Sequence, residues 1–285
     1  MKVYLIRHAS AFVDMTGQKP VKQWHLKPEG AALSGQLGEV VGGLERPPQL
    51  LISSSQLKAF ETGAHMARAL GVPLALNDAF GEVSAGVSKF LGPRYAEIMK
   101  YLFEHQDASL FGEANFADAK ARFTEGLAAL VREQQLAGLE SLGIVSHSGV
   151  LSLAYQSFAG GELEEIEKSM KFPDVAALEF KENGSFEGLI EPFGQHLLVP
   201  PVIPEEEKEA HKVIIDEIDQ ALREQKADRV AELYKQLGVS PKDPGVFNEL
   251  SGAFGASTTE WNEYRERQIP SLEELSEQGR EVTQK

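Results

Sequence analysis

Short apolar runs alternate with stretches of helical periodicity along much of the chain, and this alternation constrains the fold more than any other feature. The apolar runs are typical of buried strands and fall at residues 3–6, 49–53, 72–76 and 142–146. Apolar residues recur at the spacing of an amphipathic helix in residues 28–44, 56–70, 93–105, 115–136 and 149–158. Two later apolar runs, 175–180 and 186–190, flank Asn183-Gly184, which indicates a β-hairpin. We therefore expect an α/β fold with a mostly parallel central sheet flanked by helices.

The C-terminal part of the chain differs in composition from the part before it. A proline-rich stretch at residues 199–204 is typical of a stiff linker. Helical spacing then covers residues 205–237, with a break expected at 225–228 and a helix end at Gly238. The last 45 or so residues carry few apolar anchors, which predicts short helices lying on a partner surface, or fraying. We divide the chain into an α/β domain, 1–198, and an acidic, mainly helical C-terminal extension, 199–285.

Composition excludes several classes of function. Cysteine is absent, which excludes disulfides, thiol catalysis and thiolate metal sites. The 43 acidic and 28 basic residues give a formal net charge of −15, which argues against nucleic-acid binding. No segment resembles a secretory signal or a membrane span, so we expect a cytoplasmic protein with no membrane association. In such an acidic chain, an anionic ligand must be held by a local cluster of cations.

Basic residues and histidines stand where the predicted strands end. Arg7 and His8 follow the first strand, Lys58 lies shortly after the second, and His147 follows the fourth. Because ligands bind outside the carboxyl ends of parallel strands, we expect these four side chains to surround one anion. The other histidines show no such grouping and are expected to be structural: His25, His65, His105, His196 and His211.

Five short motifs follow one another across residues 1–193. They are Arg7-His8-Ala9, Leu-Lys-Pro-Glu-Gly at 26–30, Ser-Ser-Ser-Gln-Leu-Lys-Ala-Phe-Glu-Thr at 53–62, Phe-Gly-Glu at 80–82 and Ser-His-Ser-Gly at 146–149. Together, and in this order, they resemble the histidine phosphatase superfamily, the phosphoglycerate-mutase-like group (branch 1 type), whose fingerprint is Arg-His-Gly or Arg-His-Ala. Residues after about 200 lie outside the resemblance.

The resemblance implies a phosphoglycerate-mutase-like fold and a mechanism. His8 would be the nucleophile that forms a phosphohistidine. Arg7, Lys58 and His147 would bind the phosphoryl group, and His147 would also count among the catalytic residues. Glu82 would protonate the leaving group and then help to activate water, with Asp78 as a rival proton donor. The mechanism needs no metal ion and no cofactor.

Three positions depart from the family's pattern. Lys58 stands where the family has a second phosphate-binding Arg, and it lacks the planar fork that grips two phosphate oxygens. Asp14 stands where the family often has Asn, and Ser55 where it has Pro.

Three hypotheses about function follow. The first is a phosphatase: a metal-independent phosphomonoesterase that acts on a small phosphorylated metabolite. The second is phosphoglycerate-mutase-like phosphoryl transfer. The third is a catalytically weakened anion-binding or interaction module, for which the helices at 205–237 would supply a partner surface or a homodimer contact. Alternatively, those helices would fold over the crevice as a lid and affect substrate selectivity.

Overall fold

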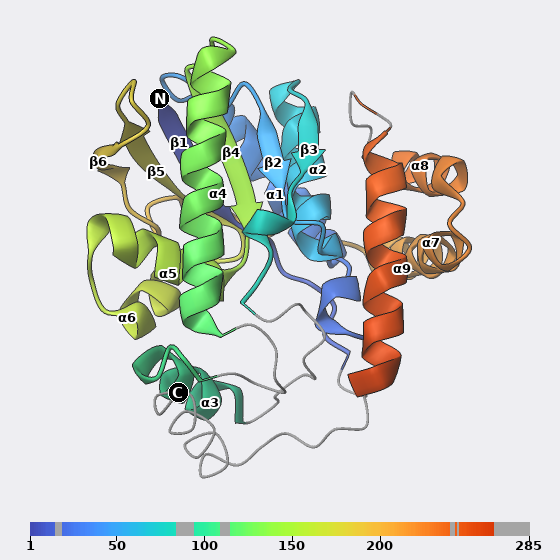
Figure 1. Cartoon of the computed structure of the whole chain (residues 1–285). Coiled ribbons are helices and arrows are strands. Elements are labelled where there is room, and N and C mark those ends of the chain that lie inside the picture. Colours follow the sequence, from blue (N-terminus) through green and yellow to red (C-terminus); the bar gives the residue numbers. More distant parts are fainter. Residues whose placement is uncertain (15–18, 84–93, 109–114, 240–242, 244, 265–285) are drawn as a thin grey trace.

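A single mixed sheet forms the centre of the structure (Figure 1). The computed structural model describes residues 1–14, 19–83, 94–108, 115–239, 243 and 245–264. Within these residues the strand order is β3-β2-β4-β1-β5-β6. Four strands are parallel: β1 (Lys2–Arg7), β2 (Leu51–Ser53), β3 (Leu74–Leu76) and β4 (Ser141–Ser146). The hairpin of β5 (Asp174–Phe180) and β6 (Phe186–Glu191) adds antiparallel strands at one edge. The predicted mostly parallel sheet is confirmed.

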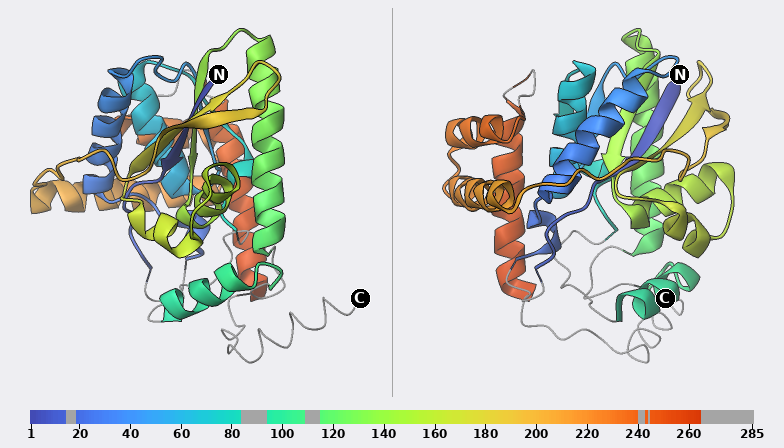
Figure 2. Two further views of the ribbon diagram at one scale, coloured as in Figure 1. Left: turned by 90° about the vertical axis from the view of Figure 1, so that its left-hand side faces the viewer. Right: turned by 180° about the vertical axis from the view of Figure 1, so that it is seen from behind.

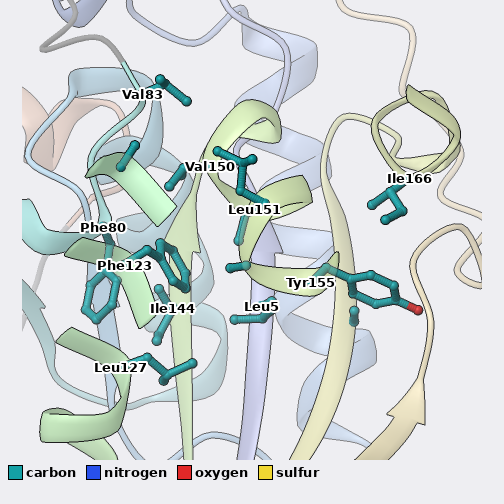
Figure 3. Packing of buried hydrophobic residues seen from close by; sticks show 14 of the residues in the cluster. Leu5, Phe80, Val83, Phe123, Leu127, Ile144, Val150, Leu151, Tyr155 and Ile166 are labelled. Carbon is teal, nitrogen blue, oxygen red and sulfur yellow. The ribbon is translucent and has the colours of Figure 1, made fainter. Parts of the chain in front are cut away.

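Helices cover both faces of the sheet (Figures 1 and 2). One face carries α4 (Phe116–Leu136) and α5 (Ser148–Ala159), and the other carries α1 (Pro28–Gly42) and α2 (Leu57–Leu70). All six residues of β1 are buried, because successive side chains enter the cores on opposite faces. Figure 3 shows the core between the sheet and helices α4 and α5, in which Leu5 and Ile144 from the sheet lie near Phe123 and Leu151 from the helices.

The predicted elements of the α/β domain are confirmed within a few residues at their ends. Pro28 begins α1, and Gly71 ends α2 with a left-handed backbone (φ +69°). The sequence prediction omits α6 (Leu163–Ser169), a seven-residue helix with two buried apolar residues, which is too short to show a periodicity. The remaining helical elements are α3 (Tyr95–Glu104) and two single turns, η1 (Val21–Gln23) and η2 (Asp78–Phe80).

The C-terminal extension packs beside α2 and β3 (Figure 1). Its helices are α7 (Glu205–Arg223), α8 (Ala227–Gln236) and α9 (Val246–Tyr264). The predicted break and helix end are confirmed, since Gln225 and Gly238 both have positive φ. Apolar side chains of the three helices join the core formed by α1 and α2: Ile218, Leu222, Val230, Leu233, Tyr234, Phe247 and Leu250. A homodimer contact through these helices stays a prediction.

The expectation for the last 45 residues is wrong where the structure describes them. Residues 246–264 form one long helix, α9, instead of short helices, and it packs on the chain's own core. Its buried residues Phe247, Leu250 and Phe254 lie three and four positions apart, with Val246 beside the first, which is the stripe of an amphipathic helix. Residues 265–285 lie outside the described residues. No described helix is long and apolar enough to cross a membrane.

Candidate active site

The predicted site residues converge at the carboxyl ends of the parallel strands, at the lower edge of the sheet in Figure 1. His8 follows β1, Lys58 lies in the first turn of α2, and His147 joins β4 to α5. The parallel register pairs Arg7 with Ser146, and this places the two following histidines side by side. The ring centroids of His8 and His147 are 5.2 Å apart. Strand register alone therefore explains why two residues 139 positions apart meet.

The His8 imidazole is held in a defined tautomer. Its Nδ1 lies 2.7 Å from the carbonyl oxygen of Ala9 and donates a hydrogen bond to it. Nε2 then carries the lone pair. Burial, followed by the nearby Lys58 and Arg7 cations, holds the pKa of His8 well below its ordinary value. At neutral pH the ring is therefore uncharged and nucleophilic at Nε2.

His147 has one occupied and one unoccupied ring nitrogen. Its Nε2 lies 3.0 Å from the hydroxyl oxygen of Ser54, which already accepts a hydrogen bond from the Gln56 amide. We assign the Ser54 hydroxyl proton to this bond, because no other described group accepts it; Nε2 is then the acceptor and Nδ1 carries the ring proton. Nδ1 is buried and has no hydrogen-bond partner among the described residues. Burial, with Lys58 and His8 beside it, lowers the pKa of His147 well below its ordinary value, so the ring is neutral. In the assigned tautomer its Nδ1–H has no acceptor among the described residues.

Arg7 and Lys58 bring two buried cations to the same place. Arg7 donates through Nη1 to the carbonyl oxygen of Met170 at 2.7 Å, and its guanidinium lies 3.4 Å from the ring centroid of Phe172. The Lys58 ammonium lies 5.4 Å from the ring centroid of Trp24 and makes no hydrogen bond to a described residue. Burial lowers the pKa of Lys58 to about 8; the Glu82 carboxylate opposes this decrease, and Arg7 adds to it. A buried ammonium without an acceptor suits an anionic ligand.

Glu82 lies at the N-terminus of α5, where the helix dipole favours a negative charge. Its Oε1 accepts hydrogen bonds from the amides of Val83 and Val150, at 2.9 and 3.0 Å. Oε2 accepts none from the described residues. Gly149 lies beside this carboxylate, and a Cβ there would lie 2.7 Å from Oε1 and would displace it. The Gly of Ser-His-Ser-Gly thus makes room for Glu82.

The rival proton donor, Asp78, faces a different partner. Its Oδ1 accepts a hydrogen bond from the Ser55 hydroxyl. Among the carboxylates, it is Glu82 whose charge acts on Lys58. The geometry therefore favours Glu82 over Asp78 as the carboxylate of the site. Asp14 lies in the segment after His8, where its Oδ2 accepts from the Lys19 amide at 2.6 Å.

Arg122 holds the segment that carries Glu82, and sequence reasoning missed it. From α4 its guanidinium donates at 2.7–3.0 Å to four carbonyl oxygens, those of Asp78, Ala79, Gly81 and Glu82. Nothing in the sequence marks this role, because Arg122 lies 40 residues from Glu82 in an ordinary helix. The contacts of Phe172 with Arg7, of Trp24 with Lys58 and of Ser54 with His147 were missed as well, because they depend on how distant parts of the chain fold together.

Comparisons with known proteins agree with this architecture. The family model of the histidine phosphatase superfamily (branch 1) matches residues 3–186. The chain belongs to this superfamily. The match ends before the linker, so the helices α7–α9 lie outside it. No curated protein sequence matches the chain.

Several solved structures resemble this chain in fold at low sequence identity. A structure named mycobacterial hydrolase 1 has 17% identity and a TM-score of 0.54, covering 66% of this chain and 95% of its own. A mycobacterial glucosyl-3-phosphoglycerate phosphatase has 14% identity and a TM-score of 0.53, covering 67% and 97%. A putative alpha-ribazole-5′-P phosphatase from Escherichia coli has 16% identity and a TM-score of 0.51, covering 70% and 98%. At these identities the likeness establishes a shared fold.

Proposed function

We propose that this histidine phosphatase superfamily member is a metal-independent phosphomonoesterase that hydrolyses a small phosphorylated metabolite through a phosphohistidine on His8. One observation carries the proposal: the Nδ1–Ala9 hydrogen bond leaves Nε2 of a neutral, buried imidazole available among Arg7, Lys58 and His147. A neutral imidazole beside fixed cations suits attack on a phosphate ester.

The first step transfers the phosphoryl group to the enzyme. His8 Nε2 attacks phosphorus, a P–N bond forms, and the bond between phosphorus and the ester oxygen breaks. Protonated Glu82 gives its proton to the departing alkoxide through Oε2, the oxygen that the backbone amides do not occupy. Arg7, Lys58 and the Nδ1–H of His147 bind the three non-bridging oxygens and neutralise their charge.

The second step regenerates the enzyme. The Glu82 carboxylate accepts a proton from water, whose oxygen attacks phosphorus. The P–N bond breaks, the electron pair returns to Nε2 of His8, and inorganic phosphate leaves. In both steps the same fixed cations, Arg7 and Lys58, neutralise the negative charge of the phosphoryl group.

Phosphate release in excess EDTA, with wild type and His8→Ala compared, tests the proposal. The substrates are an aryl phosphate and a panel of phosphorylated metabolites, and His105→Ala, a substitution at the exposed residue that follows α3, is the matched control. We expect wild-type and control activity to survive chelation and His8→Ala to lose at least about 10³-fold, as expected for removal of a nucleophile. Full activity in His8→Ala, or activity that chelation abolishes, would end the proposal.

The same assay separates the two other hypotheses. An isomerised phosphate ester that appears ahead of free phosphate would indicate mutase activity instead. The single ammonium of Lys58 in place of a guanidinium fork is the observation that favours a weakened, anion-binding module. Binding of inorganic phosphate without turnover of any substrate would support that module.

A further inference from the structure

A buried polar cluster joins the C-terminal extension to the α/β domain. It consists of His25, Glu61 on α2, Asp219 on α7 and Tyr234 on α8, none of which is more than 4% exposed. Asp219 and Tyr234 lie outside the region that matches the superfamily. Buried polar groups of this kind are stable only when they are hydrogen-bonded, so each member must be held by the others.

Every member of the cluster is hydrogen-bonded. His25 contacts Glu61 through Nδ1 at 2.5 Å and Asp219 through Nε2 at 2.9 Å. Burial alone would lower the pKa of His25, but the Glu61 and Asp219 carboxylates outweigh it and raise the pKa to about 9. Tyr234 donates its hydroxyl proton to Glu61 at 2.8 Å, and its ring stacks on Phe247 of α9. The extension therefore holds a protonated His25 between two carboxylates.

Two short routes lead from this cluster to Lys58. Trp24, whose ring lies beside the Lys58 ammonium, directly precedes His25 in the chain. Glu61 lies one helical turn after Lys58 on α2, so the two share a helix face. Any displacement of His25 or Glu61 thus moves either the aromatic wall of Lys58 or the helix turn that carries it.

A third contact ties the same helix turn to the proposed nucleophile. Thr62 accepts a hydrogen bond from the Ala9 amide at 2.9 Å and donates to the carbonyl oxygen of Lys58 at 2.7 Å. The residue after His8 and the backbone of Lys58 are therefore held by the neighbour of Glu61.

We propose that the C-terminal extension positions the phosphate-binding Lys58, with Asp219 and Tyr234 as positioning residues that act through His25 and Glu61. Lys58 needs such positioning because of the chemistry of its side chain. An arginine fork orients itself on phosphate through two parallel hydrogen bonds, whereas a lysine ammonium on a flexible stem does not. In this chain, the Trp24 wall and the fixed turn of α2 supply the orientation. The inference rests on the proposed function only in naming phosphate as the ligand of Lys58.

Conservative substitutions in the full chain test this role. Asp219→Asn removes the negative charge that contacts His25 through Oδ1 and Lys19 through Oδ2, and Tyr234→Phe removes one hydrogen bond to Glu61; both keep the side-chain shape. Glu232→Gln on the exposed face of α8 is the matched control. The measurements are KM and kcat for an aryl phosphate, the Kd of inorganic phosphate and the Tm. For Asp219→Asn we expect KM and the phosphate Kd to rise about tenfold, because the charged contact that fixes His25 is weakened, with a smaller change in kcat. Tyr234→Phe should give a smaller rise, and the control none.

A second background distinguishes positioning from a general loss of stability. In Lys58→Arg the guanidinium fork orients itself, so adding Asp219→Asn should raise the phosphate Kd by clearly less than it does in the wild-type background. A lowered Tm with unchanged phosphate Kd in both cluster variants would overturn the inference, as would an equal effect of Asp219→Asn in the wild-type and Lys58→Arg backgrounds. Wild type that binds phosphate without turnover would end the proposed function alone, because the phosphate Kd still reports on Lys58.

Discussion

Two buried histidine regions of this protein have opposite electrostatics. His8 and His147 are as deeply buried as His25, with at most 8% of any of the three exposed. In the candidate active site the nearest charges are the cations Arg7 and Lys58, and the pKa of each imidazole lies well below its ordinary value. Around His25 the nearest charges are Glu61 and Asp219, and the pKa rises to about 9. Burial lowers the pKa of the imidazole in both regions; the cations beside His8 and His147 add to that decrease, whereas the carboxylates beside His25 reverse it.

This difference indicates that the candidate active site can accept an anionic ligand, whereas the polar groups around His25 already have their partners within the protein. The cluster around His25 contains its own anions, and both ring nitrogens are hydrogen-bonded. The active site contains cations, an ammonium without an acceptor and a buried His147 Nδ1 without a partner among the described residues. A bound phosphoryl group would provide there what Glu61 and Asp219 provide around His25.

Removal of His25 should give the largest effect on stability. His25→Ala removes the cation that Glu61 and Asp219 share, so Glu61 stays buried without a positive partner and Asp219 keeps only Lys19. Breaking such a buried pair costs about 3–5 kcal/mol. Urea unfolding would measure this loss, with His105→Ala at the exposed end of α3 as the control expected to change stability by less than about 0.5 kcal/mol. If His25→Ala were as stable as wild type, His25 would not stabilise the buried carboxylates, and the contrast with the candidate active site would fail.

Removal of His147 should affect activity more than stability. His147→Ala deletes a buried N–H that has no partner among the described residues but that would bind a phosphoryl oxygen. We expect kcat/KM for the aryl phosphate to fall about 10²–10³-fold, as when one oxyanion donor is lost, with a smaller stability loss than in His25→Ala. Steady-state kinetics and urea unfolding on the same preparation would measure both quantities. Retained activity with a large loss of stability would reverse the roles assigned to the two regions.

Much of the fold could be predicted because buried parallel strands are short apolar runs with clear ends. The register of β1 on β4 was not needed to expect His8 beside His147, since the carboxyl ends of parallel strands meet at one edge. Helix α9 was missed because its apolar stripe is sparse and its C-terminal half is polar. Helix α6 has too few residues to show a period.

The partners of the site residues could not be predicted, because they come from distant parts of the chain. The carbonyl of Met170 on Arg7 and the guanidinium of Arg122 on the Glu82 segment belong to no motif. His25 was expected to be structural, and its complete hydrogen bonding confirms this. Its charge depends on Asp219, 194 residues away, and no local pattern reports that contact.

The pH dependence of stability should separate the two regions by the sign of its slope. The folded pKa of His25, about 9, lies above the ordinary value of 6.5, so its stabilisation is complete below pH 6.5 and is lost as the pH rises through 9. This loss amounts to about 3 kcal/mol. For His8 and His147 the folded pKa is depressed, so their contribution is present above pH 6.5 and is lost as the pH falls below it. Burial also lowers the pKa of His65, to about 4, and this residue adds to the same acid slope. We therefore expect stability to fall on both sides of pH 6.5.

Variants assign each slope to its region. In urea unfolding from pH 5 to 9.5, His25→Gln should remove the loss between pH 6.5 and 9 while the acid slope persists, because His8 and His147 are untouched. Inorganic phosphate should have the converse effect: by binding the cations of the candidate active site it favours protonation of His8 and His147. The acid slope should then decrease to the part that His65 contributes, and the alkaline slope should remain. An alkaline slope that survives in His25→Gln would mean that Glu61 and Asp219 do not hold a charged imidazole, and the contrast between the regions would then rest on the active site alone.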